Sequence, residues 1–412
     1  MTPEERLAET VRVEGRRVLA TLIRTVGSLA VAEDAVQDAV LAALASWPRT
    51  GVPDDPRAWL TVTARRKAYD VLRREAARPA KEVAAGQDLP VLAPDPAEEV
   101  VEMEPESAVR DDLLRLLFTC CHPALRREAQ VALALRTLAG LEVPAIARAF
   151  LVPEATMAKR LVRARQKIAA ARIPYRVPSD AELPERLPAV LAVVHLIATE
   201  GHAPSTGDGV VRVDLETEAL RLARLVAELM PGEPEVLSLL ALLLLTQARR
   251  PARTDAGGRP VLLADQDRSR WDRAAIREGV ARLAEAVRRS GGVAGPYQLQ
   301  AHLAACHSTA PSWADTDWDR IVGLYDLVLT LGPNPAVALN RAVAVGHRDG
   351  PAAALAALDA DPIRTHLWHA ARADALTGLG WTADARAELV AAIELAPTAP
   401  DRRLLADRLA GL

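Results

Sequence analysis

The chain has 412 residues, of which 50% are hydrophobic, 25% charged and 3% aromatic, and its formal net charge is −3. This length favours two to four domains, and cores that must be built from Leu, Val and Ala favour helices, so we expect an all-α fold. Three cysteines, two of them adjacent at Cys120 and Cys121, exclude a disulfide framework, and the longest apolar runs are too short to span a bilayer. Because nothing near Met1 resembles a signal peptide, we expect a cytoplasmic protein.

Residues 1–78 are predicted to form three or four helices, because apolar residues recur there at helical spacing. The two sets are Val18, Leu19, Leu22, Ile23 and Val26, and Ala35, Val36, Ala39, Val40, Ala43, Leu44 and Trp47. The stretch "PRTGVPDDP" at 48–56 contains three prolines and a glycine and predicts a loop. Pro56 then opens a helix that runs from Arg57 to about Arg74.

Residues 79–107 carry eight acidic residues and one basic residue, are rich in proline and alanine, and show no sustained hydrophobic period. This composition predicts a flexible linker. Its negative charge would also compete for the basic surfaces of its neighbours.

Basic residues are concentrated in 108–177, where thirteen of them stand against five acidic residues and the net charge is +8. Ser107 can cap a first helix through "AVRDDLLRLLFTCC", and further helices are predicted over 124–139, 144–150 and 154–172. A short helix, a tight turn and a longer basic helix are typical of a helix-turn-helix.

The last of these helices has two unlike faces. Met157, Leu161, Ala164 and Ile168 recur at spacings of four, three and four and predict a buried stripe. The cationic side chains lie on the other side, where they can contact phosphates along a major groove. The alternative is a basic helix that is only solvated.

Residues 178–412 are predicted to be helical in a repeated arrangement. Segments 225–245, 325–345 and 390–409 each combine an apolar helix ending near a proline with a helix opened by a second proline. Small residues at Ala373, Ala385 and Ala392, followed by Pro397, resemble a tetratricopeptide unit, in which two antiparallel helices approach closely.

Several stretches together resemble one protein family. The regions 2 and 4 of extracytoplasmic-function sigma-70 factors are similar to "AEDAVQDAVLAAL" (32–44), "PRAWLTVTARRKAYDVLRRE" (56–75) and "GLEVPAIARAFLVPEATMAKRLVRARQKI" (140–168). The subgroup with a long C-terminal tetratricopeptide-like extension is similar to "FTCCHPAL", "RIPYRVP", "LADQDRSRWDR", "PYQLQAHLAACH" and "ALNRAVAV". The resemblance covers nearly the whole chain and implies a dissociable, non-enzymatic subunit of bacterial RNA polymerase that recognises promoters.

The same resemblance implies sigma region 2 at 1–78, sigma region 4 at 108–177 and a regulatory domain at 178–412. The implied partners are core RNA polymerase and the −10 and −35 promoter elements, and no cofactor is implied. Members of this subgroup often neighbour small DGPF-type (YCII-related) proteins, so one of these is a candidate partner of the extension.

An acidic helix face is the candidate contact with the polymerase. Glu33, Asp34, Gln37 and Asp38 are predicted to lie on the exposed side of a helix whose other side is Ala and Val. Asp34 and Asp38 repel each other at i, i+4, which costs roughly a few tenths of a kcal/mol that a basic partner would relieve. The resemblance implies docking on the coiled coil of the polymerase clamp, and the alternative is an acidic first turn favoured by the helix dipole.

The resemblance also implies that the helix after Pro56 contacts the −10 element. The candidate residues are Trp59, Arg65, Arg66, Lys67, Arg73 and Arg74. Cationic side chains follow single-stranded phosphates, and bases stack on aromatic rings. Arg66 stands where many members have asparagine, and for Trp59 core packing is the favoured alternative.

The −35 element is assigned by resemblance to the last helix of the second module. Thr156, Lys159, Arg160 and Arg163 match the base-reading positions, and Arg165 and Lys167 are the candidate phosphate contacts. Ala158 stands where many members have lysine. Glu142 and Val143 replace the usual hydroxyl residues before the first short helix, which weakens its cap by about 1 kcal/mol.

The remaining motifs indicate less. "CCHP" and "HLAACH" lack four ligands at zinc-finger spacing, so we expect buried cysteines and no metal. "QDRSRWDR" (266–273) is either a binding surface or an ion-paired helix start, and "LIATEGHAP" departs from the subgroup's motif at Thr199 and His202. Two rival functions are a helix-turn-helix regulator with a ligand-sensing helical domain and a helical scaffold with a fortuitous basic module.

Overall fold

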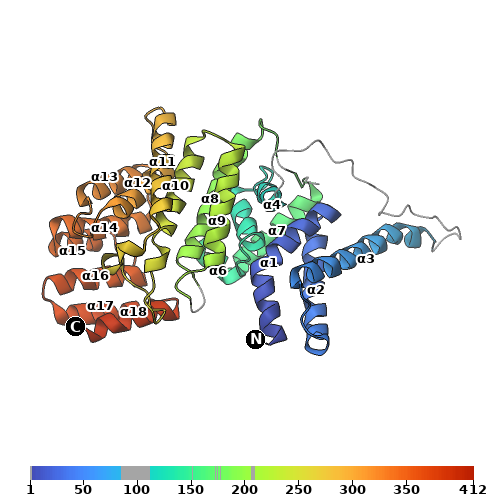
Figure 1. The fold of residues 1–412 in the computed structure, drawn as a ribbon, viewed down its shortest axis with the longest axis horizontal. Coiled ribbons are helices and arrows are strands. Elements are labelled where there is room, and N and C mark those ends of the chain that lie inside the picture. The colour runs from blue at the N-terminus through green and yellow to red at the C-terminus, as the bar shows by residue number, and fades with distance from the viewer. Residues whose placement is uncertain are drawn as a thin grey trace. The chain divides into compact units, whose positions relative to one another are not determined.

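A computed structural model of the chain describes all residues except 1, 85–111, 151, 172, 174, 177 and 206–208. The part that it describes contains eighteen α-helices and three short 3-10 helices and has no β-strand (Figure 1). The expected all-α class is therefore confirmed. The helices form two compact units, Met1–Val193 and Val194–Leu412, and each unit is described by itself.

The first module of unit 1 consists of α1 (Pro3–Val26), α2 (Leu29–Thr50) and α3 (Pro56–Ala84). Helix α1 begins with a capping box between Thr2 and Glu5 and ends at Gly27, whose φ of 68° is the left-handed conformation that glycine tolerates. The three helices pack on alanines and on Trp47, which is 1% exposed. Small residues let the helices approach closely, which is how a chain poor in aromatics closes this core.

Two element boundaries in this module differ from the sequence-based expectation. Helix α2 continues through Pro48 to Thr50, so the loop expected at 48–56 is confined to residues 51–55. Helix α3 begins at Pro56 as expected but extends beyond Arg74 to Ala84, where strong helix formers flank Pro79 on both sides. The rest of the predicted linker, and the predicted Ser107 cap, lie outside the described residues.

The second module consists of α4 (Asp112–Cys120), α5 (Arg127–Thr137), α6 (Val143–Ala149) and α7 (Glu154–Ala170). Helices α6 and α7 form the expected helix-turn-helix. Met157, Leu161, Ala164 and Ile168 are all buried, so the predicted apolar stripe of α7 is confirmed. The N-cap residue Glu142 of α6 makes no side-chain capping hydrogen bond, as its sequence predicted.

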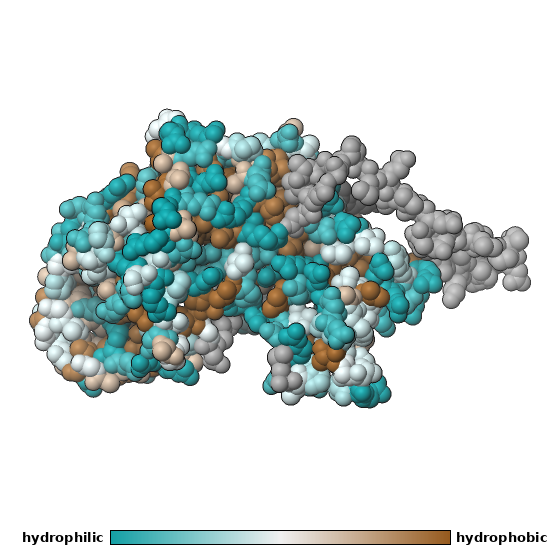
Figure 2. Space-filling model, viewed as in Figure 1, coloured by the Kyte–Doolittle hydropathy of each residue, from teal (hydrophilic) through white to brown (hydrophobic). Residues whose placement is uncertain are grey.

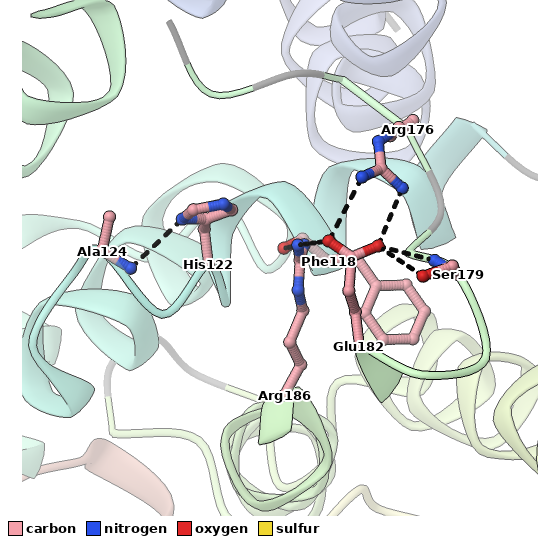
Figure 3. A network of polar contacts seen from close by, with 7 residues as sticks. All are labelled: Phe118, His122, Ala124, Arg176, Ser179, Glu182 and Arg186. Atoms are coloured by element: carbon pink, nitrogen blue, oxygen red, sulfur yellow. Dashed lines mark hydrogen bonds and ion pairs between the residues drawn. The ribbon is translucent and has the colours of Figure 1, made fainter. Parts of the chain in front are cut away.

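A polar network fastens the start of α8 (Leu183–His202) to the second module (Figure 3). Arg186 is 4% exposed, and its guanidinium donates to the carbonyl of Phe118 on α4 at 3.2 Å and to the Glu182 carboxylate at 3.2 Å. Glu182 also accepts from the guanidinium of Arg176 at 3.0 Å and from the backbone N–H and hydroxyl of Ser179 at 2.9 and 2.8 Å. This network holds a buried arginine in place through both of its terminal nitrogens.

Acid is expected to weaken unit 1 through Glu182. The hydrogen bonds from the Ser179 backbone and hydroxyl, followed by the Arg176 guanidinium, lower the pKa of Glu182 from 4.5 to about 2. Because the folded-state pKa lies below the unfolded one, this contribution is present above pH 4.5 and is lost as the pH falls from 4.5 towards 2. In urea unfolding, Glu182→Gln should lose less stability than the wild type between pH 7 and pH 3.

Glu185→Gln is the matched control for that experiment, because Glu185 is an exposed acid three residues further on, in the first turn of α8, and accepts no hydrogen bond from Ser179. It should keep the wild-type pH dependence. An identical pH dependence in Glu182→Gln and the wild type would contradict the assignment.

Unit 2 is built from antiparallel helices that follow one another along the chain. They are α9 (Val213–Leu229), α10 (Pro234–Gln247), α11 (Arg273–Arg289), α12 (Pro296–Thr309), α13 (Trp318–Thr330), α14 (Pro335–Asp349), α15 (Pro351–Ala360), α16 (His366–Gly378), α17 (Thr382–Leu395) and α18 (Ala399–Ala410). The second proline of each predicted repeat lies in the first turn of a helix, at Pro234, Pro335 and Pro400. Ala373, Ala385 and Ala392 are fully buried between α16 and α17, as the tetratricopeptide-like spacing predicts.

Candidate functional site

Helix α2 presents a face that combines acidic, amide and apolar side chains. Asp34, Gln37 and Asp38 are exposed, while Ala35 and Ala39 on the opposite side are buried. The same face continues through Leu41 and Leu44, whose side chains are 62% and 44% exposed. We call Asp34, Gln37, Asp38, Leu41 and Leu44 the α2 face.

The two leucines of the α2 face were not among the sequence candidates, and Leu44 was expected in the core. The helical period could have predicted that Leu41 belongs to this face. Leu41 lies seven residues after Asp34 and three after Asp38, so the three residues share one side of the helix. In the view of Figure 2 a small hydrophobic patch lies over the end of α2 among hydrophilic residues. Exposed apolar residues beside acids are typical of a protein-binding surface rather than of a solvated helix.

Glu33 does not lie on the exposed face, so this expectation was wrong. Its carboxylate is 17% exposed and pairs with the guanidinium of Arg165 on α7, at 2.7 Å from Nε and 3.1 Å from the second nitrogen. The helix turns about 100° per residue, which directs Glu33 away from Asp34 and towards α7. The guanidinium of Arg165, a predicted phosphate contact, is therefore already paired with Glu33. Asp34 and Asp38, in contrast, form no ion pair with any residue that the structure describes.

Helix α3 carries an exposed cationic stretch. Arg65, Arg66, Lys67 and Arg74 are exposed, and no acidic partner pairs with them among the described residues. Arg73 pairs with Asp70 of the same helix at 3.1 Å. Trp59 is half-buried and packs edge-on against Trp47, with ring centroids 5.5 Å apart. This contact supports the core-packing alternative for Trp59.

Helix α7 carries the second cationic surface, on the side opposite its buried stripe. Thr156, Lys159, Arg163 and Lys167 are exposed, and within the described parts of the chain the three basic residues of this set have no ion-pair partner. Arg160 is half-buried, with its guanidinium 5.6 Å from the centroid of the Phe150 ring at the end of α6. A guanidinium held over an aromatic ring keeps its donors oriented outward, which suits base recognition.

The cysteine and tryptophan motifs have structural roles. Cys120, Cys121 and Cys306 are buried, and burial raises the pKa of the Cys120 thiol to about 12. Among the described residues no group of three His, Cys, Asp or Glu side chains is placed to hold a metal ion, and no helix is long and apolar enough to cross a membrane. In "QDRSRWDR", Trp271 is 3% exposed and Asp272 caps α11, which favours a helix start over an exposed binding surface.

Comparisons with known proteins assign these surfaces to a family. The sigma-70 region 2 model matches residues 10–78, and the sigma-70 region 4 model matches residues 115–168. Residues 186–287 match a family of unknown function, DUF6596. An uncharacterized protein of Rhizobium meliloti (strain 1021) is 43% identical over 405 residues, which cover 96% of this chain and 93% of that relative. No solved structure matches the chain significantly.

The two sigma-70 matches include the α2 face and both cationic helices in the order that a sigma factor requires. A regulator that needs only its helix-turn-helix would leave α2 and α3 without a shared purpose. The matches therefore disfavour the regulator and bear out the resemblance found in the sequence. The chain belongs to the sigma-70 family: it is a sigma factor of the extracytoplasmic-function type with a C-terminal helical extension, and it acts with core RNA polymerase on promoter DNA.

Proposed function

We propose that the α2 face binds core RNA polymerase, that α3 contacts the −10 element, and that α7 reads the −35 element. The protein itself catalyses no reaction and works in the cytoplasm, where the polymerase and the chromosome are. The observation that carries this proposal is the open basic face of α7: Lys159, Arg163 and Lys167 are exposed opposite a fully buried stripe.

The composition of the α2 face suits a basic protein partner. Asp34 and Asp38 are one turn apart and repel each other, and a cationic surface would relieve this repulsion. Leu41 and Leu44 add apolar area, which supplies binding free energy at the centre of an interface once it is covered. A solvated acidic turn would not require two exposed leucines.

The two cationic helices suit two forms of DNA. On α3, Arg65, Arg66, Lys67 and Arg74 follow one another closely enough to track the phosphates of a separated strand. On α7, the helix-turn-helix geometry directs exposed side chains into a major groove, where arginine donates to guanine and lysine neutralises phosphates.

The pair between Glu33 and Arg165 links the two modules of unit 1. It joins α2 directly to α7, and Tyr175 reinforces the contact, with its hydroxyl 3.0 Å from the Ala20 carbonyl and 2.6 Å from the Asp112 carbonyl. The −35 and −10 elements are centred about 25 base pairs apart, roughly 85 Å along B-DNA. We infer that simultaneous binding to both elements breaks the Glu33–Arg165 pair and frees Arg165 for a phosphate.

Tethered DNA cleavage tests the module assignment. Because the three native cysteines are buried, a cysteine introduced at Val162 on α7 or at Val62 on α3 can be labelled selectively with an iron chelate. These neutral positions are 50% and 39% exposed and lie beside the proposed contacts. In the holoenzyme, Val162→Cys should cut near the −35 element and Val62→Cys near the −10 element.

Val293→Cys in unit 2 is the matched control, since Val293 is 77% exposed. It should cut neither element. Cutting near the −10 element from position 162, or near the −35 element from position 62, would reverse the assignment.

The extension is proposed to regulate the sigma factor or to recruit a protein to it. Its tandem helical pairs form the type of scaffold that other proteins use for peptide or protein contacts. A small DGPF-type protein remains the expected partner by resemblance.

A further inference from the structure

Unit 2 contains a pocket of about 390 Å³ where three distant parts of the chain meet. The end of α8, the segment after α10 and the start of α18 each contribute to its wall. The polar side chains that line it are those of His202, Arg249, Arg253, Gln266, Thr398 and Asp401, and apolar residues such as Leu404 complete the wall. The volume lies within the range of small-molecule sites, and the mixture of apolar walls with a few convergent polar groups is typical of them.

Arg249 is the unusual member of this lining. Its Nε is sealed from solvent and has no hydrogen-bond partner, and among the described residues no carboxylate pairs with its guanidinium. Burial, together with the positive charges of Arg253 and Arg268, lowers the pKa of Arg249 to about 10, so the group is still charged at neutral pH. Arg249 as a whole is half-buried, and a largely desolvated charge without a counter-ion is costly, so native proteins normally pair such groups.

The two neighbouring arginines, Arg250 and Arg253, both have partners. Arg250 is 3.5 Å from the buried carboxylate of Glu216. Arg253 donates to the carbonyl of His202 and, at 3.0 Å, to its Nδ1. Of these three arginines, Arg249 is the one whose guanidinium has no acceptor among the described residues.

A second unpaired group belongs to the same lining. The amide nitrogen of Gln266 donates to the Val261 carbonyl at 3.2 Å, and in the described part of the chain no donor reaches its buried Oε1. At the start of α18, Thr398 caps the helix and donates its hydroxyl to Asp401 at 2.6 Å. Among the described residues, the pocket therefore has a guanidinium without a counter-ion at Arg249 and an acceptor oxygen without a donor at Gln266.

We propose that this pocket binds a small organic anion, with a carboxylate or phosphate group on Arg249 and a hydroxyl or amino donor towards Gln266. The planar guanidinium of arginine matches either oxyanion through two parallel hydrogen bonds. Binding would pair the buried charge and the orphan acceptor together. The pocket lies in unit 2 and is tested by ligand binding, so the result does not depend on the proposed roles of α2, α3 and α7.

Thermal unfolding of the full-length protein tests the proposal with four probes. Malate and succinate carry the same two carboxylates but only malate has a hydroxyl, while glycerol 3-phosphate and inorganic phosphate form the corresponding phosphate pair. Sodium chloride at equal ionic strength is the reference. We expect the Tm to rise with ligand concentration, by about 5 to 10 °C at roughly 100 times the Kd, and to rise more for the hydroxyl-bearing member of the effective pair.

Arg249→Gln should abolish the shift without lowering the Tm of the ligand-free protein, because it removes a half-buried charge that pairs with no acid among the described residues. Arg249→Lys keeps the charge but loses the two parallel N–H donors of the guanidinium, and it should weaken binding by about tenfold. Arg277→Gln, which removes an exposed arginine of α11, is the matched control and should respond as the wild type does.

Gln266→Leu should erase the preference for malate over succinate, or for glycerol 3-phosphate over phosphate. Equal shifts in the wild type and Arg249→Gln would overturn the proposal, as would the absence of any shift beyond sodium chloride with all four probes. A response to one pair only would identify the ligand as a carboxylate or as a phosphate.

Discussion

Replacing Asp34 and Asp38 together by lysine is expected to lower the affinity for core RNA polymerase by at least about 100-fold, the equivalent of about 2.7 kcal/mol. The reason is that both carboxylates are exposed on the α2 face and pair with no basic residue that the structure describes, so the substitutions oppose like charges across the proposed interface. The affinity is measured with fluorescently labelled protein titrated with purified core enzyme at fixed salt.

Glu128→Lys combined with Glu185→Lys is the matched control, because it makes the same change in net charge at two exposed acids of unit 1 that lie outside the α2 face. This variant should bind core polymerase as the wild type does. Unchanged binding by the Asp34 and Asp38 variant would remove the α2 face from the interface.

Arg163→Ala is expected to reduce promoter-specific transcription by the holoenzyme by about 5-fold to 150-fold, which corresponds to the loss of about 1–3 kcal/mol for one base contact. Arg163 is exposed on the open face of α7 and pairs with no acid among the described residues. Its loss therefore leaves the fold intact and removes only the contact with DNA. The measurement is run-off transcription from a promoter that carries both elements.

The decisive comparison for Arg163 uses a second template in which the −35 element is scrambled. On that template the wild type and Arg163→Ala should perform equally, because the contact is already absent. Arg126→Ala, at an exposed arginine before α5, serves as the control. An equal fractional loss on both templates would show that Arg163 acts elsewhere than at the −35 element.

The helical class and the buried stripe of α7 could be predicted from the sequence because they depend on local spacing. Met157, Leu161, Ala164 and Ile168 recur with the helical period, and any packed helix of this pattern buries them. The lengths of α2 and α3 were less predictable, since Pro48 continues a helix here instead of ending it. Local propensity gives the type of an element more reliably than its limits.

The composition of the candidate sites depended on contacts that local spacing does not encode. Glu33 and Arg165 are separated by 132 residues, and their pairing withdraws one predicted polymerase contact and one predicted phosphate contact from the surface. The pocket at Arg249 is closed by Thr398 and Leu404, far along the chain. No sequence pattern marks Arg249 as unpaired, because that property belongs to its neighbours in space.

As a sigma factor, this chain gives core RNA polymerase its promoter specificity. The most direct test is run-off transcription from a genomic fragment library with core enzyme alone, the protein alone, and both together. We expect discrete transcripts only from the combined reaction, with start sites downstream of shared −35 and −10 sequences. Specific DNA footprints by the protein alone, without association with core enzyme or new transcripts, would contradict the claim and indicate an independent DNA-binding regulator.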